Sequence, residues 1–113
     1  MATSTIKAKA IPFTATILSS ATDGTFNGMF YPDSGVVTFT YSIRLSANVD
    51  TLTALWTIPA DYRPSSSVTY CLFAYISTGN PIAYYGSIST AGAVTQNASQ
   101  SCRHIIGMGT YKV

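Results

Sequence analysis

A single histidine, His104, is the side chain of this sequence whose pKa best suits proton transfer near neutral pH. A catalytic imidazole needs a nucleophile within reach, and the sequence alone does not place a serine or cysteine beside it. Cys102 shares a strand face with His104, but two ligands at this spacing without a third do not predict a metal site. We therefore expect a structural or ligand-contacting histidine, with no metal, no cofactor and no catalysis.

The four aspartates are the only acidic residues, and they lie in or beside predicted turns. An aspartate in such a position usually hydrogen-bonds its own backbone. Hydrolysis of a glycosidic bond requires two carboxylates at a defined separation, which this sequence does not supply. We therefore interpret Asp23, Asp33, Asp50 and Asp61 as turn residues and predict that the protein is not an enzyme.

The chain is poor in charge. Charged residues make up 9% of its 113 residues, against roughly 25% in ordinary globular domains. A surface with so little charge offers little resistance to association, so we expect part of it to be buried between identical subunits. The six lysines and arginines are scattered, which argues against nucleic-acid binding. No apolar run approaches the ~20 residues that span a bilayer, so membrane insertion is not expected. Cys71 and Cys102 match no metal-ligand spacing and are expected to be free thiols.

Aromatic side chains are concentrated in the second half of the chain, where five of the eight tyrosines lie between residues 62 and 85. A tyrosine offers a flat apolar ring with one polar group, which suits sugar rings and protein interfaces alike. Filling of a core or of a subunit contact is the alternative for each of them. On chemistry alone, the candidate ligand-binding residues are Tyr84 and Tyr85 as stacking surfaces, with Arg103 and His104 as polar partners.

Alternating apolar and polar residues recur along the chain between turn residues, as in antiparallel sheets. The clearest segment is 36–46, where Val37, Phe39 and Tyr41 alternate with threonine and serine. We predict a single all-β domain over residues 1–113, an antiparallel two-sheet sandwich of jelly-roll type. About eight strands are expected, at 13–19, 28–31, 36–46, 53–58, 68–77, 82–88, 101–106 and 110–113. Turns are expected at 23–24, 32–35 and 79–81, and residues 89–100 are predicted to be flexible.

The predicted strand 68–77 is apolar on both faces. Its even-numbered residues from 68 to 76 form one apolar face, and Cys71, Phe73 and Tyr75 form the other. A strand of this kind should be covered on both sides. Because a two-sheet sandwich buries only one face of each sheet, the second face is available to a neighbouring subunit.

One stretch, WTIPADYRP at 56–64, resembles a segment of the C-terminal head domains of tailed-bacteriophage fibre, tip and baseplate proteins. Further segments are similar in order and spacing, so that the resemblance covers residues 28–113: FY at 30–31, GVVTF at 35–39, IAYYGSI at 82–88 and GTYKV at 109–113. In the family a hairpin turns at the glycine of the 82–88 segment, although Tyr85 here replaces the usual Asp or Asn before that glycine. Pro59 and Pro64 predict a rigid structural connector, in which Arg63 pairs with Asp61 or with a carbonyl group.

The resemblance implies a jelly-roll-like sandwich that forms a homotrimer and binds a host cell-surface saccharide, without cofactor or catalysis. It places the protein in the virion tail, assembled in the host cytoplasm beside other tail or baseplate proteins, with residues 1–10 as a candidate attachment segment. No ligand contact of the family matches this sequence residue by residue. The alternatives are a structural virion protein without a host ligand, such as a trimerising cap or decoration protein, and a hydrolase of surface polysaccharide.

Overall fold

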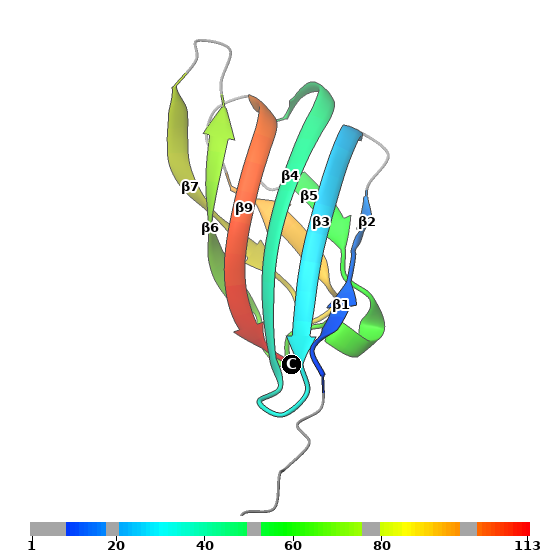
Figure 1. The fold of residues 1–113 in the computed structure, drawn as a ribbon. Helices are drawn as coiled ribbons and strands as arrows, with labels where there is room; N and C mark the ends of the chain where they lie inside the picture. The colour runs from blue at the N-terminus through cyan, green and yellow to red at the C-terminus, as the bar shows by residue number, and fades with distance from the viewer. Residues whose placement is uncertain (1–8, 18–20, 50–52, 76–79, 98–101) are drawn as a thin grey trace, which may run out of the picture.

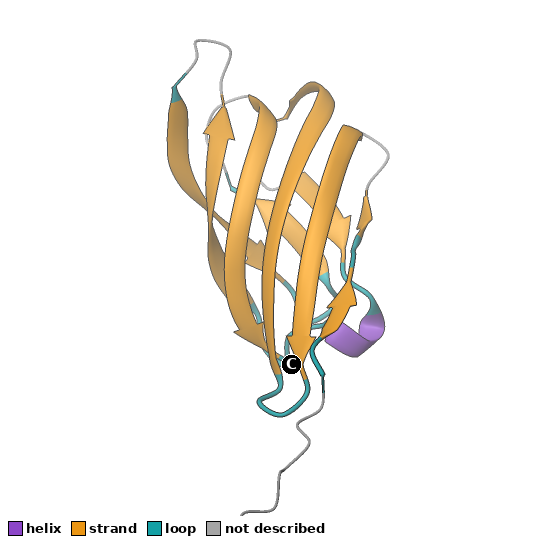
Figure 2. Cartoon of the chain, in the orientation of Figure 1, coloured by secondary structure: helices purple, strands orange, loops and turns teal. Residues whose placement is uncertain are grey.

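Nine antiparallel strands form one continuous sheet in the order β1-β3-β4-β9-β6-β7-β8-β5-β2 (Figure 1). The computed structural model describes residues 9–17, 21–49, 53–75, 80–97 and 102–113. The strands are β1 (Ile11–Phe13), β2 (Thr16–Ile17), β3 (Ala21–Tyr31), β4 (Val36–Val49), β5 (Thr53–Thr57), β6 (Val68–Tyr75), β7 (Pro81–Ile88), β8 (Ala93–Gln96) and β9 (Cys102–Lys112). A short 3-10 helix, η1 (Ala60–Tyr62), joins β5 to β6 (Figure 2), and the described residues include no α-helix and no helix able to cross a membrane. The predicted all-β class is confirmed.

The sheet is curled, because its two edge strands are almost continuous in sequence. Only Thr14 and Ala15 separate β1, which pairs with β3, from β2, which pairs with β5 at the opposite edge. In Figure 1 the strands β3, β4, β9 and β6 form the near wall, and β5 and β8 lie behind them. The enclosed side of the sheet holds the hydrophobic core. We call the opposite side of β3, β4, β9, β6 and β7 the outer face.

Strand β4 illustrates why the chain folds in this way. Val37, Phe39 and Tyr41 are buried, whereas Thr40 and Ser42 between and beyond them are exposed. Full burial of a large apolar side chain contributes about 1.5–3 kcal/mol, so a segment that alternates in this pattern is held with one face against the core. The alternation predicted for 36–46 is confirmed, and the strand continues to residue 49.

Two buried tyrosines connect the near wall to the strands behind it. The Tyr70 hydroxyl donates to the carbonyl of Thr95 at 2.8 Å and therefore accepts from the Tyr41 hydroxyl, 2.6 Å away. Each ring covers a glycine directly opposite it on a neighbouring strand: Gly107 lies opposite Tyr41, and Gly86 lies opposite Tyr70. The missing side chains of these two glycines leave the space that the rings occupy.

The proline-bounded stretch between β5 and β6 is a structural connector, as predicted. Arg63 Nε donates to the carbonyl of Ile58 at 2.8 Å, so of the two predicted partners, Asp61 or a carbonyl group, the structure shows a carbonyl. The Tyr62 ring stacks on Phe13 with centroids 4.4 Å apart. The backbone carbonyl of Tyr62 also accepts a hydrogen bond from the Tyr111 hydroxyl. The connector is therefore fixed to both β1 and β9.

Two segments expected to be irregular are strands. The predicted turn at 23–24 is wrong, because β3 runs through it and pairs with β4 down to the Tyr31–Val36 pair. Residues 89–100, predicted to be flexible, contain β8, which lies between β7 and β5. In both segments hydrogen bonds to another strand outweigh the local preference for a turn, because strand formation depends strongly on context.

Strand β9 is longer than predicted. Segments 101–106 and 110–113 belong to the single strand β9, which is continuous through Gly107. The strand predicted at 82–88 is confirmed as β7, which passes through Gly86 and pairs with β6 along its whole length, so this chain has no hairpin turn at that glycine. Conversely, the strand expected at 13–19 is interrupted at residues 14–15.

The predicted turn at 32–35 is confirmed and contains Asp33, with Gly35 at a φ of 70°. Asp61 lies in η1, whereas Asp23 lies within β3 rather than in a turn. Asp50 and the first residue of the predicted 79–81 reversal lie outside the described residues.

Burial raises the pKa of the Tyr70 and Tyr111 hydroxyls well above the usual tyrosine value near 10. Above about pH 10 the unfolded chain loses these protons while the folded chain keeps them, so stability falls with rising pH in that range and is unaffected below it. We expect the free energy of unfolding to fall by about 1.4 kcal/mol per pH unit for each tyrosine. Urea unfolding at several alkaline pH values measures the slope. Tyr111→Phe should remove one of the two contributions, and an unchanged slope in this variant would contradict the assignment.

Candidate functional site

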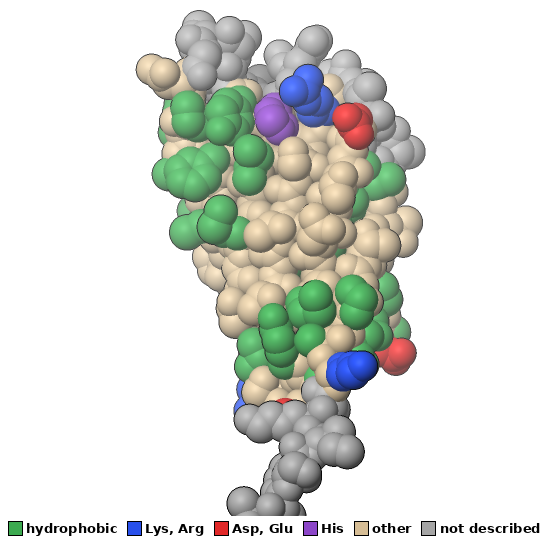
Figure 3. All heavy atoms as spheres, viewed as in Figure 1, with side chains coloured by type: hydrophobic (Ala, Val, Ile, Leu, Met, Phe, Trp, Pro, Cys, Tyr) green, Lys and Arg blue, Asp and Glu red, His purple; other side chains and the backbone are tan. Residues whose placement is uncertain are grey.

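The outer face is almost free of charge. Because side chains alternate along each strand, the face presents every second residue of β7, β6, β9, β4 and β3. Among the described residues its charged members are Asp23 and Arg44 at one end and Lys112 at the other. Figure 3 shows uncharged side chains over the whole centre of this face. Such a surface can be covered by a neutral molecule or another protein without desolvating a charge.

An apolar patch occupies the outer face over β7, β6 and β9. We define the apolar patch by six side chains: Cys71, Phe73, Tyr75, Tyr85, Ile106 and Met108. Tyr85, Cys71 and Met108 lie opposite one another in the register, and Phe73 lies opposite Ile106 in the next row. Tyr85 exposes 55% of its surface, Met108 47% and Phe73 41%. In Figure 3 a hydrophobic area lies beside the histidine on this part of the face. Large contiguous apolar areas of this kind mark interaction surfaces.

The second apolar face predicted for 68–77 is therefore present on β6 and open to solvent within a single chain. Tyr70, Leu72 and Ala74 are buried on the enclosed side, while Cys71 and Phe73 are exposed on the outer face. Cys71 is a free thiol, as predicted. The side chain of the second cysteine lies outside the described part of the structure.

His104 lies at the end of the apolar patch. Its ring stacks on Tyr75 with centroids 5.1 Å apart, and Nε2 lies 3.0 Å from the Ser42 hydroxyl oxygen. Burial, and secondarily the neighbouring Arg44 guanidinium, lower the pKa of His104 below its usual value. The lowered pKa favours the neutral imidazole, and the contacts with Tyr75 and Ser42 orient the ring.

The Ser42–His104 pair has the separation of a nucleophile and its general base. A working pair also requires a third group that orients the imidazole and donors that stabilise the developing charge. No described acidic side chain contacts the histidine ring, and the described residues hold no cluster of three or more His, Cys, Asp or Glu side chains. We therefore interpret the contact between Ser42 and His104 as structural, because it orients the His104 ring on the outer face.

The structure does not bring together the three predicted ligand-binding side chains that it describes, those of Tyr84, Tyr85 and His104. Tyr85 and His104 share the outer face, but they lie two strands apart and are offset along the strands by four residues, or about 13 Å. Tyr84 belongs to the other side of β7 and packs against the hydrophobic core. The side chain of Arg103 lies outside the described part of the structure.

Phe73, Ile106 and Met108 fill the space between Tyr85 and His104, and the sequence-based site did not include them. The alternation of residues 104, 106 and 108 places these positions on one strand face. Alternation does not reveal that β9 pairs with β6, and it is this pairing that brings Ile106 beside Phe73.

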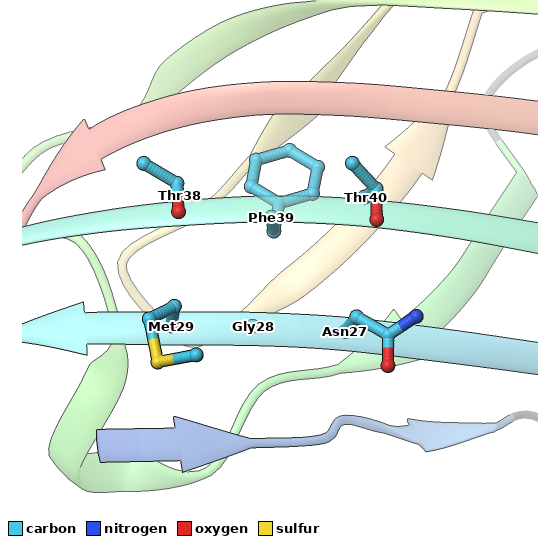
Figure 4. Close-up of a pocket in the computed structure, with 6 residues that line it drawn as sticks. All are labelled: Asn27, Gly28, Met29, Thr38, Phe39 and Thr40. Carbon is cyan, nitrogen blue, oxygen red and sulfur yellow. The ribbon is translucent and has the colours of Figure 1, made fainter. Parts of the chain in front are cut away.

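A shallow hollow of about 170 Å³ lies on the outer face over β3 and β4 (Figure 4). Asn27 and Met29 of β3 stand on one side of it, and Thr38 and Thr40 of β4 stand on the other. The backbone of Gly28 and Phe39 contributes its floor. Unlike the apolar patch, the hollow has hydroxyl and amide groups on both sides, although most of its lining surface is apolar.

The fold and its outer face define an all-β protein built on a curled antiparallel sheet, with a broad uncharged surface as the candidate functional site. No model of a known protein family matches the sequence, and no curated protein matches it.

Proposed function

We propose that this chain is a host-adhesion head domain of a phage tail protein, which binds a bacterial cell-surface saccharide and catalyses no reaction. The observation that carries this proposal is the broad uncharged outer face with the exposed aromatic side chain of Tyr85. Aromatic rings with an accessible face suit the apolar faces of sugar rings. The resemblance of residues 28–113 to phage head domains supports the viral context.

We further propose that the centre of the apolar patch is the contact between three copies of the chain. Phe73, Ile106 and Met108 form this centre, and their burial would contribute about 25 cal/mol per Å² of apolar surface. The charges of the outer face lie at its ends, so copies could meet through this centre without burying an unpaired charge. Tyr85 and His104 flank the centre and remain candidate ligand contacts. The curled sheet with its enclosed core is compatible with the jelly-roll-type sandwich of the family.

The apolar patch also supports a second candidate, a structural virion protein such as a trimerising cap or decoration protein. In that case the patch would contact copies or other tail proteins, and no host saccharide would be bound. The two candidates differ in one measurable property, because only an adhesion domain recognises the host surface.

Binding of the purified chain to a glycan array and to host envelope fractions distinguishes the candidates. We expect saturable binding to a surface saccharide, weakened about tenfold by Tyr85→Ala through loss of a ring contact. Ile17→Ala is the matched control, because Ile17 is exposed by 38% on β2, away from the outer face. Stable assembly with other tail proteins, together with indifference to every host fraction, would contradict adhesion and favour the structural role.

A further inference from the structure

The polar side chains around the hollow over β3 and β4 are free to bind a ligand. Within the described part of the chain, no hydrogen bond engages the side chain of Asn27, Thr38 or Thr40. Asn27 offers an amide that both donates and accepts, and each threonine hydroxyl can do the same. Figure 4 shows both threonine hydroxyls on the side nearer β3, with Asn27 across from Thr40. A ligand rich in hydroxyl groups can therefore be bonded from both strands at once.

The hollow combines these polar groups with an apolar contact and no charge. Met29 lies opposite Thr38, so a thioether and a threonine methyl group adjoin the hydroxyls. The Phe39 ring is turned into the core with 3% of the residue exposed, which leaves backbone at the floor. The lining contains no lysine, arginine or acidic residue. A mostly apolar surface with a few hydrogen-bonding groups and no charge favours a neutral ligand that has both apolar faces and polar edges over a phosphate or a carboxylate.

We propose that this hollow is a binding subsite for one ring of a neutral saccharide. Its volume of about 170 Å³ is smaller than the roughly 300 Å³ of the smallest typical ligand pockets, so the hollow suits one ring rather than an oligosaccharide. The subsite rests on the saccharide ligand of the proposed function and deepens it. It places the ring on β3 and β4, at a position separate from Tyr85 and His104.

The test is an NMR titration of the full ¹⁵N-labelled chain with neutral methyl glycosides of glucose, galactose, rhamnose and N-acetylglucosamine. With at least one of them, the amide signals of 27–29 and 38–40 should shift saturably, with a Kd on the order of 1–10 mM, as an open site with few contacts allows. Asn27→Ala and Thr40→Val should each weaken binding about fivefold, because each removes one hydrogen-bonding group. Thr25→Val is the matched control, since Thr25 is exposed on the same face of β3 and does not line the hollow.

The subsite is overturned if no glycoside shifts these signals, if the shifts are confined to the surroundings of Tyr85 and His104, or if Asn27→Ala and Thr40→Val bind like the unmodified chain. Its failure is distinguishable from failure of the adhesion proposal. A chain that binds host envelope fractions equally well with and without both substitutions contradicts only the subsite. An unmodified chain that binds no host fraction contradicts adhesion itself.

Discussion

Gly107→Ala is expected to lower the free energy of unfolding by about 3 kcal/mol or more. A Cβ atom at this position would lie 2.5 Å from Tyr41 Cζ and 2.7 Å from its hydroxyl oxygen. The Tyr41 ring is 2% exposed and is surrounded by other aromatic rings, including those of Trp56 and Tyr70, both with centroids 5.9 Å away. Displacing it would therefore strain the core and disturb its hydrogen bond to Tyr70. Urea unfolding monitored by tryptophan fluorescence measures the loss.

Two other glycines provide a graded comparison. Gly86→Ala should destabilise the protein to a similar extent, because the added carbon would lie 2.5 Å from Tyr70 Cζ and closer still to the Thr95 carbonyl oxygen. Gly109→Ala should cost less, about 1 kcal/mol, since its nearest contacts are at 3.0 Å. If Gly107→Ala were as stable as the unmodified chain, the packing of Tyr41 over this glycine would be wrong.

Phe73→Asp is expected to convert the proposed trimer into a folded monomer. Phe73 is 41% exposed on the outer face, so the fold of one chain does not depend on its burial. In the assembled state the same substitution would bury an unpaired carboxylate among apolar side chains, at a penalty of several kcal/mol per copy. Sedimentation velocity at a fixed protein concentration measures the change in mass, and circular dichroism verifies that the variant is folded.

Tyr31→Asp is the matched control for this substitution. Tyr31 is exposed to the same extent, 42%, but lies on β3 at the far end of the outer face. It should leave the trimer intact. The Cys71 thiol gives an independent readout, because it lies within the apolar patch and should react slowly in the trimer and rapidly in Phe73→Asp. Equal masses and equal thiol reactivity for all three proteins would exclude the patch as the contact.

The parts of the fold that were predictable from sequence are those in which one strand carries its own pattern. Val37, Phe39 and Tyr41 specify the buried face of β4 by alternation alone, whatever strands lie beside it. The failures at 23–24 and within 89–100 have the opposite cause. Asp23–Gly24 favours a turn locally, and only the pairing of β3 with β4 makes it part of a strand. Local sequence contains no information about that partner.

In the candidate site, too, some features follow from the pattern of one strand, whereas others depend on which strands pair. Alternation along the predicted strand 82–88 already separates Tyr85 from Tyr84, and β7 follows this alternation. The apolar patch depends on β6 lying beside β9, although β7 and β8 come between them in sequence. Phe73 and Ile106 are therefore neighbours that no spacing along the chain could reveal. The hollow over β3 and β4 likewise depends on the register that places Asn27 opposite Thr40.

Light scattering from the purified chain tests most directly whether the outer face joins identical copies. The proposed trimer has a mass of about 36 kDa, three times the 12.0 kDa of one chain. We predict this value for the unmodified chain and the mass of one chain for Phe73→Asp. An unmodified chain that scatters as a 12.0 kDa monomer at concentrations far above those of the binding assays would contradict the proposal.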